Sequence, residues 1–381
     1  MIQTLLDLTE YGLKGKLYPH PIKDEKQFLK MAFESGLIGI IFESIDSKQV
    51  SEYFYKEIRK IFYNFVGSDN AQRAFINKLD SLFNKNNIKH TFLKGSHLKT
   101  IYQKSYFRGM GDVDCLVDKK DTKKISTLLK ELDFEVHAKS EEHDVYEYKG
   151  LMVEIHRTIS HTLNKKTQSL FSKPEEHLIQ DEYYRYRLEY TYEGVYLLHH
   201  LSKHIMSSGV GLRSLLDISI FFNYYEAQID RTKLQLYLTE TGLEKFFMII
   251  LAFNEKAFRV KTSFLDNEFQ LDKTSYETLL KYLVTSGIHG KGEEFNEMAP
   301  RTVNESKFKV LLRALFPNWN NMKEMYSWLK YIPILLPFAY MIRWFKLVFL
   351  RSKNSFRKLS KLKNSNDEKD ELKKLFEDLG L

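Results

Sequence analysis

The segment 111–117 constrains the fold of this chain more than any other part of the sequence. It reads as a β-strand that contains the acidic pair Asp112 and Asp114. Because side chains two apart on a strand share a face, the two aspartates point the same way, while Val113 and Cys115 point into the core. The segment therefore predicts a sheet with one apolar face and two carboxylates on the other.

A third carboxylate follows in the run 151–155, where Glu154 alternates with Val153 and Ile155. If this run lies beside the segment 111–117, Glu154 joins the two aspartates on their face. Three clustered carboxylates can hold two divalent ions about 3.5–4 Å apart and so clamp a triphosphate. We therefore predict two Mg²⁺ ions, with Mn²⁺ as a substitute, on the catalytic and metal-binding residues Asp112, Asp114 and Glu154.

A candidate phosphate-binding turn precedes the acidic pair. The strand-like run 90–93 leads into Gly95 and Ser96 at the start of a helix-compatible stretch, so backbone N–H groups and the Ser96 hydroxyl can face phosphate oxygens. Lys94 and Arg108 are candidates for positive charge near the phosphates, and solvated surface positions are the alternative for both.

Other polar residues are candidates for contacts to the nucleotide or its acceptor. His156 shares a strand face with Glu154 and could contact the triphosphate or acceptor, with a partly buried structural histidine as the alternative. Lys203, in a predicted helix, could cover the nucleotide from a second lobe. His200 and His204 lie four apart on that helix, but no third zinc ligand is evident, so structural roles are favoured.

The next predicted helix contains Arg213 and Asp217, which could also reach the nucleotide from the second lobe. Their spacing of four is more simply explained by an ion pair on a helix surface.

Hydrophobic periodicity divides the chain into four parts. Residues 1–68 form an N-terminal helical segment, and 69–160 form a core in which strand, helix, strand, helix and three strands follow one another. A two-residue turn at Lys149-Gly150 joins the last two strands. Residues 161–331 form a mostly helical lobe, and 332–381 form an apolar and basic helical extension. The predicted fold class is α+β, a small mixed sheet with helices, flanked by helices on both sides.

The net charge of +8 is concentrated near the C-terminus, since 343–363 contains eight Lys or Arg residues and no Asp or Glu. The rest of the chain is close to neutral. A long nucleic acid would need basic charge along the folded domains. The charge pattern therefore favours a small molecule, a glycan precursor or a protein as the partner over a long nucleic acid.

The run 331–350 is the most apolar part of the chain, but two prolines and two basic residues interrupt it, so it does not predict a transmembrane helix. Together with the basic residues of 343–363, it predicts either contact with a membrane interface or a helix packed on the helical lobe. The single cysteine, Cys115, and the charged first residues predict a cytoplasmic protein, with the inner membrane face as the place of any such contact.

Three phrases of the sequence resemble a known family. The bacterial uncharacterised nucleotidyltransferase family, within the DNA polymerase beta-like nucleotidyltransferase superfamily, has similar motifs to the segments 93–95, 108–117 and 153–156. In that superfamily a Gly-Ser pair binds the triphosphate and three carboxylates bind two metal ions. The resemblance assigns these roles to Gly95, Ser96, Asp112, Asp114 and Glu154. It implies a metal-dependent transfer of a nucleoside monophosphate from an NTP to a hydroxyl-type acceptor, with release of pyrophosphate.

Two other functions are compatible with parts of this pattern. A catalytically silent nucleotide-binding or regulatory module, at a membrane surface for example, would keep the fold without the transfer. The intact carboxylate trio disfavours it, because clustered carboxylates repel one another and bring no benefit without a cation. Phosphotransfer of the kinase sort also uses aspartates and Mg²⁺, but the chain contains no Gly-x-Gly-x-x-Gly loop and no matching catalytic loop.

Overall fold

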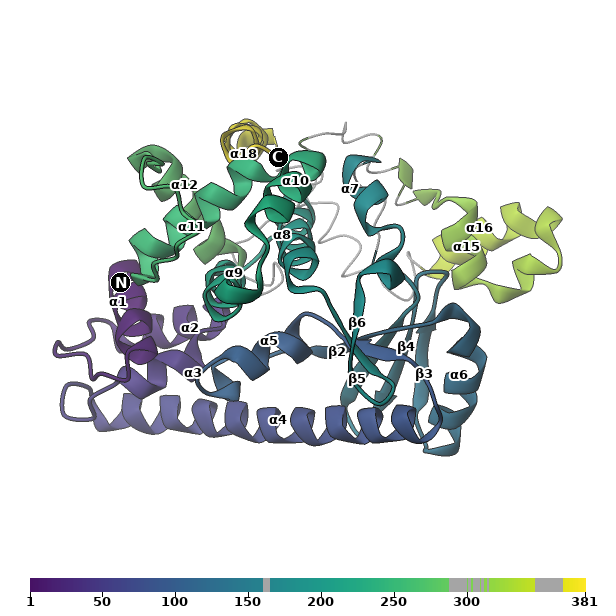
Figure 1. Ribbon diagram of the computed structural model, residues 1–381, viewed down its shortest axis with the longest axis horizontal. Coiled ribbons are helices and arrows are strands. Elements are labelled where there is room, and N and C mark those ends of the chain that lie inside the picture. Colours follow the sequence, from purple (N-terminus) through teal and green to yellow (C-terminus); the bar gives the residue numbers. More distant parts are fainter. Residues whose placement is uncertain are drawn as a thin grey trace.

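The computed structural model describes residues 1–159, 165–287, 315–346 and 366–381, together with residues 300, 303, 309, 312 and 313. Figure 1 shows a sheet that lies between one long helix and a group of helices from the second half of the chain. The predicted α+β fold class, with a small mixed sheet and helices on both sides of it in the sequence, is confirmed.

The sheet has seven strands in the order β3-β4-β5-β2-β1-β7-β6. Their bounds are β1 His90–Phe92, β2 Asp112–Val117, β3 Glu135–Lys139, β4 His143–Tyr148, β5 Leu151–His156, β6 Leu178–Glu182 and β7 Arg185–Leu188. Strand β2 lies at the centre, antiparallel to β1 and parallel to β5, and β4 is antiparallel to β5. The five strands expected between residues 90 and 155 are all present.

The turn between β4 and β5 is the expected two-residue turn. Lys149 and Gly150 both have positive φ, 52° and 79°, as a type I′ hairpin turn requires. This turn sets the register, so Tyr148 pairs with Leu151 and each earlier residue of β4 pairs with a later residue of β5.

Strands β6 and β7 were not expected, because the sequence after residue 160 was read as helical. Both are short, and β6 has exposed side chains at four of its five positions, so the alternation of apolar and polar residues that marks a half-buried strand is absent there. Strand β7 pairs in parallel with β1 and extends the sheet on that side.

The helices of the first half are α1 Ile2–Leu13, α2 Glu25–Ser35, α3 Ile38–Ile41, α4 Glu52–Lys85, α5 Gly95–Ile101, α6 Thr122–Glu131 and α7 Lys165–Phe171. Helix α4 corrects one expectation: Ser68-Asp69 is a sequence typical of a helix cap and predicts that a new helix begins there. The helix instead begins after the cap Ser51 and continues through that point. The Asp69 carboxylate is buried and lies 2.8 Å from Lys99 Nζ, so it is used for a tertiary ion pair rather than as a cap.

The helices of the second half are α8 Tyr190–Ser207, α9 Leu212–Tyr224, α10 Arg231–Thr241, α11 Glu244–Phe258, α12 Lys273–Ser286, α15 Trp319–Met325, α16 Leu336–Phe345 and α18 Asn366–Leu379. Parts of the predicted lobe and extension, including 288–299 and 347–365, lie outside the described residues. Helix α18 packs against α11 and α12. Within the described residues, no helix combines the length and apolar character that crossing a bilayer requires.

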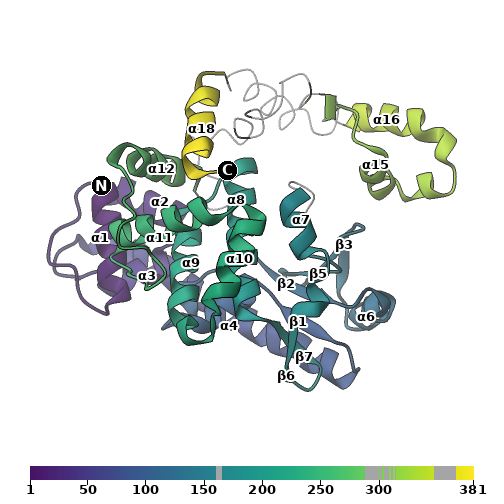
Figure 2. The same ribbon diagram turned by 45° about the horizontal axis from the view of Figure 1, so that its top comes forward.

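The two faces of the sheet have different neighbours. Val113 and Cys115 of β2 are buried in a cluster with apolar side chains of α4 and α6. Asp112 and Asp114 therefore face the opposite side, toward α5, α8 and α9 (Figure 1). A separate small apolar cluster is formed by α15, α16 and the residues between them (Figure 2), and Lys323 Nζ of α15 lies 3.3 Å from a carboxylate oxygen of Glu141, between β3 and β4.

Candidate active site

The parallel pairing of β2 with β5 brings the three carboxylates to one face of the sheet. Asp114 is the direct register partner of Glu154, and Asp112 is the partner of Met152. Because directly paired residues project to the same face, Glu154 lies beside Asp114, and Asp112 lies one pleat further along β2. The neighbours Val153 and Ile155 are fully buried on the other face.

A cavity of about 310 Å³ separates this sheet face from helices α8 and α9. The residues of the sheet and its adjoining turns that line it include Lys94, Gly95, Arg108, Asp112, Asp114, His143, Glu154 and His156. The charged and imidazole side chains that line it from the helices include His200, Lys203, His204 and Arg213. Ser96 does not occur among the lining residues, and its Oγ lies 3.9 Å from the sulfur of Met110.

Asp114 is the most heavily paired carboxylate of the cavity. Its Oδ1 lies 2.8 Å from Lys94 Nζ and 2.9 Å from His156 Nε2. Burial alone would raise the pKa of Asp114, but the charge of Lys94 and the hydrogen bond from His156 outweigh it and hold the pKa below its usual range. Asp114 is therefore ionised and fixed in place by two partners.

The backbone at Lys94 is bent to aim this ammonium at Asp114. Lys94 has φ 49° and ψ −120°, a conformation that a residue with a Cβ rarely adopts, and it directly precedes α5. Burial favours neutral Lys94, but attraction to Asp114 outweighs it and raises the pKa of Lys94. Gly95 follows where space is short: a Cβ there would lie 2.8 Å from Nη1 of Arg108. Arg108 and Met110 would have to shift to admit a larger residue at this position.

Asp112 and Glu154 complete a cluster with excess negative charge. Burial and the charges of Asp114 and Glu154 raise the pKa of Asp112. The hydrogen bond from His156 lowers the pKa of Glu154 against the effect of burial. Carboxylate oxygens are the donors that Mg²⁺ prefers, and a divalent cation would relieve the repulsion that raises the pKa of Asp112. The three side chains therefore fit the predicted metal site.

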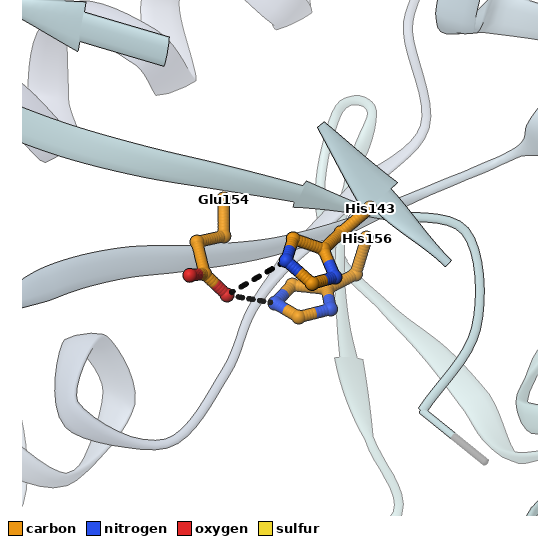
Figure 3. A group of neighbouring side chains, drawn as sticks. All are labelled: His143, Glu154 and His156. Carbon is orange, nitrogen blue, oxygen red and sulfur yellow. Dashed lines mark ion pairs between the residues drawn. The ribbon is translucent and has the colours of Figure 1, made fainter. Parts of the chain in front are cut away.

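His143 is a member of this site that sequence reasoning missed. Strand β4 pairs antiparallel with β5, so His143 is the direct partner of His156 and Val145 is the partner of Glu154. His156 Nε2 lies 3.2 Å from Glu154 Oε2, and His143 Nε2 lies 3.9 Å from the same oxygen (Figure 3). The expected turn at Lys149-Gly150 contained the signal, because counting back from a two-residue turn pairs position 143 with position 156.

The wall formed by α8 and α9 is rich in cationic and imidazole groups. Lys203 lines the cavity, and burial together with the charge of Lys94 lowers its pKa. Arg213 is buried, and burial together with repulsion from Arg108 lowers the pKa of Arg213 to about 10. The rings of His200 and His204 approach to 3.0 Å between their Nε2 atoms.

The expectation of a surface ion pair between Arg213 and Asp217 is wrong. Both side chains are buried, because α9 faces the sheet across the cavity rather than solvent. Asp217 Oδ2 lies 3.0 Å from Arg108 Nη2, and its Oδ1 accepts a hydrogen bond of 2.8 Å from the Tyr102 hydroxyl. Arg108 is thus held by the second lobe while it lines the cavity.

One comparison with known proteins identifies related sequences. A family model described as "Uncharacterised nucleotidyltransferase" matches residues 21–259, which is more than half of the chain. Neither the curated proteins nor the solved structures contain a match to the chain. The matched range includes both walls of the cavity and ends after α11.

Proposed function

The chain belongs to the uncharacterised nucleotidyltransferase family, and from that premise we propose that it is a metal-dependent enzyme that moves a nucleoside monophosphate from an NTP to a hydroxyl-type acceptor. The observation that carries the proposal is the parallel register of Asp114 with Glu154 beside Asp112, which puts three carboxylates into one cavity. In this reaction the acceptor oxygen bonds to the α-phosphorus, the bond from that phosphorus to the bridging oxygen breaks, and pyrophosphate leaves.

Asp112, Asp114 and Glu154 would hold two Mg²⁺ ions, or Mn²⁺ in their place. When bound, such ions neutralise triphosphate charge and make a coordinated hydroxyl more acidic. The chain itself keeps Asp114 ionised and oriented through Lys94 and His156. The positions of the three carboxylates depend on strand pairing, so the geometry is set before substrate arrives.

The remaining cavity residues would bind and orient the substrates. Lys203 and Arg213 face the carboxylates from the helical wall and would bind phosphate oxygens. Lys94, Gly95 and Arg108 would approach the triphosphate from the turn before α5 and the loop before β2. His156 would contact the triphosphate or the acceptor.

The cavity is enclosed by helices on one side, and no basic groove of the folded core was predicted from the charge pattern. We therefore propose that the acceptor is a small molecule, a glycan precursor or a protein side chain rather than a long nucleic acid.

The test is metal-dependent NTP binding followed by turnover. Purified full-length protein is titrated with each NTP in the presence of Mg²⁺ or Mn²⁺, and pyrophosphate release is measured with an acceptor extract. We expect both signals to disappear in an Asp112→Ala, Asp114→Ala double variant and to persist in Glu131→Ala, which removes an exposed carboxylate of α6. Binding without any pyrophosphate release would favour the silent nucleotide-binding module, and absence of binding would refute the proposal.

A further inference from the structure

We propose that His143, Glu154 and His156 form a binding site for a transition-metal ion of the Zn²⁺ class, adjoining the carboxylates of Asp112 and Asp114. One ligand atom of each of the three residues lies within 4.8 Å of the others. Figure 3 shows the two imidazole rings side by side, with their Nε2 atoms directed at the same carboxylate oxygen.

The separations match what a four-coordinate ion needs. Bonds of about 2.0–2.1 Å in a tetrahedron put the ligand atoms about 3.3 Å apart. The Oε2 atom of Glu154 is 3.2 Å from Nε2 of His156 and 3.9 Å from Nε2 of His143. The His143 side chain is 29% exposed, so its ring has room to move closer to the other two ligand atoms.

The donor set selects the kind of ion. Imidazole nitrogens suit Zn²⁺, Co²⁺ and related ions, whereas Mg²⁺ prefers oxygen ligands and retains its water. Two histidines with one glutamate also leave a fourth position open, as in zinc sites that bind a water or a substrate. The three residues therefore favour a Zn²⁺-class ion over Mg²⁺, which a cluster of carboxylates alone would not do.

The backbone holds these ligands before any ion arrives. His143 and His156 are direct partners in the β4–β5 hairpin, and Glu154 is two residues before His156 on the same face. The two positive-φ residues of the Lys149-Gly150 turn set the hairpin register. A site whose ligands come from two paired strands needs little rearrangement on binding, which favours tight retention of the ion.

The experiment uses Co²⁺, whose visible absorption reports the geometry of its ligands independently of enzyme activity. Full-length protein is freed of metal with a chelator and titrated with Co²⁺, then with Zn²⁺ in competition. We expect the first equivalent to bind with the absorption of a four-coordinate nitrogen and oxygen site, before any Co²⁺ enters the carboxylate site that shares Glu154. His143→Ala should weaken binding by at least about 100-fold, since even residues one step behind a ligand affect affinity 10–100-fold.

His137→Ala is the matched control, because His137 lies on the neighbouring strand β3, faces Glu147, and is largely exposed. It should bind Co²⁺ like the unaltered chain. If His143→Ala does not fold, judged by circular dichroism, His143→Gln replaces it. Equal binding by the His143 variant and the control, absence of Co²⁺ binding, or displacement by equimolar Mg²⁺ would each refute the site. Metal binding without nucleotidyl transfer would refute only the proposed function.

A second inference comes from the unit formed by α15, α16 and the short helical turns between them, Ser327–Lys330 and Pro333–Leu335. One face of α16 packs on the rest of this unit: Ala339 is buried with Met322, Tyr326 and Leu329. The other face is also apolar. Its side chains Phe338, Met341 and Phe345 are 53%, 61% and 59% exposed, and Ile334 of the turn before α16 is 83% exposed.

Phe338, Met341 and Phe345 are three and four positions apart, which places them in one stripe along α16, and Ile334 lies in the 3₁₀ turn just before the helix. Stripes of this kind on an otherwise folded protein mark interaction surfaces. Tyr331, 86% exposed, lies just before the stripe. Figure 2 shows the unit apart from helices α11, α12 and α18 of the helical lobe.

We infer that the stripe lies in the interface of an anionic lipid bilayer. The sequence 343–363, which begins within α16, has eight Lys or Arg residues and no acidic one. Each basic residue near an anionic lipid surface contributes about 1 kcal/mol. Apolar and aromatic side chains beside dense positive charge are typical of helices that lie in a membrane interface. Residues 347–363 lie outside the described residues, so their part rests on sequence alone.

The test is cosedimentation with vesicles of neutral lipid or of neutral lipid mixed with phosphatidylglycerol. We expect binding only to the anionic vesicles, and loss of that binding in a Phe338→Ser, Met341→Ser, Phe345→Ser variant. A Tyr53→Ser, Tyr63→Ser variant is the control, because both tyrosines are exposed on α4, at 75% and 63%. Unchanged binding by the stripe variant would refute the inference. So would a dimer that dissociates in that variant without any vesicle binding, which would identify a second copy as the occupant.

Discussion

The two walls of the cavity carry opposite charge and are built in different ways. The strand wall presents Asp112, Asp114 and Glu154 from adjacent strands, where backbone register sets the spacing. The helix wall presents Lys203 and Arg213, whose long side chains reach in from α8 and α9. The strand wall therefore suits a small cation that demands fixed geometry, and the helix wall suits a flexible anion.

The walls also differ in how their charges are compensated. Asp114 is paired with both Lys94 and His156. On the helix wall, burial and neighbouring cations lower the pKa of Lys203 and of Arg213, the latter to about 10. An anion bound between these cations would raise their pKa values again. A triphosphate would therefore stabilise the charges of the helix wall more than those of the strand wall.

The largest expected effect comes from removing the central charge of the strand wall. Asp114→Asn should reduce metal-dependent NTP turnover by more than about 100-fold, because a ligand should matter more than the residues that support ligands. It should also lower the free energy of unfolding by about 3–5 kcal/mol, since Lys94 would remain buried without its partner. Denaturant unfolding and pyrophosphate release measure the two effects.

Asp144→Asn is the control for this variant. Asp144 is a buried carboxylate of β4, paired with Arg157 at 3.1 Å, and it does not line the cavity. It should lose comparable stability and keep turnover. If both variants lose turnover equally, stability rather than charge on the strand wall explains the loss.

A smaller effect is expected on the helix wall. Lys203→Met should raise the Kd for NTP by about 10-fold or more, because hydrogen bonds to charged groups contribute about 1.5–3 kcal/mol. Binding of Co²⁺ or Mn²⁺ in the absence of NTP should stay the same. Lys123→Met, at an exposed position of α6, should change neither quantity. If Lys203→Met weakened metal binding but not nucleotide binding, it would contradict the assignment of the nucleotide to the helix wall and of the metal ions to the strand wall.

The smallest effect concerns the link between the walls. His97 of α5 lies 2.6 Å from Glu193 of α8, and its other ring nitrogen lies 2.8 Å from the Tyr225 hydroxyl. Burial lowers the pKa of His97, but attraction to Glu193 outweighs it and raises the pKa overall. The stability that this pair contributes is therefore fully present below the unfolded value of about 6.5 and is lost as pH rises through the folded value.

Glu193→Gln should therefore cost about 1 kcal/mol or somewhat more at pH 6, and less at pH 9. Unfolding in denaturant at both pH values measures this difference. Glu189→Gln removes a partly buried partner of Lys233, an amine that stays charged at both pH values, and should show no such trend over this range. A cost for Glu193→Gln that grows with pH would show that His97 is neutral in the folded protein.

The sequence predicted most of the strand wall. The five strands between 90 and 155, the turn at Lys149-Gly150 and the common face of Asp112 and Asp114 all follow from local patterns. His143 could have been found by counting back from that turn. Strands β6 and β7 could not, because β6 is exposed at four of its five positions and β7 is half-buried at three of its four, so neither shows the alternation of a half-buried strand.

Local sequence patterns did not predict how the side chains of the helix wall are arranged. The sequence suggested a surface pair for Arg213 and Asp217, since residues four apart on a helix are neighbours. Whether that helix surface meets solvent or another lobe depends on packing between distant segments. In the folded chain, Asp217 binds Arg108 instead, a residue more than one hundred positions earlier.

The sequence by itself determined which side chains share a face, because the two-residue period of a strand is a property of its backbone. It thereby placed Asp112 with Asp114, and Glu154 with His156. Only the tertiary structure decided that β5 lies parallel to β2 and that Lys203 and Arg213 face the carboxylates. These relations depend on contacts between segments far apart in the chain, and local periodicity carries no information about them.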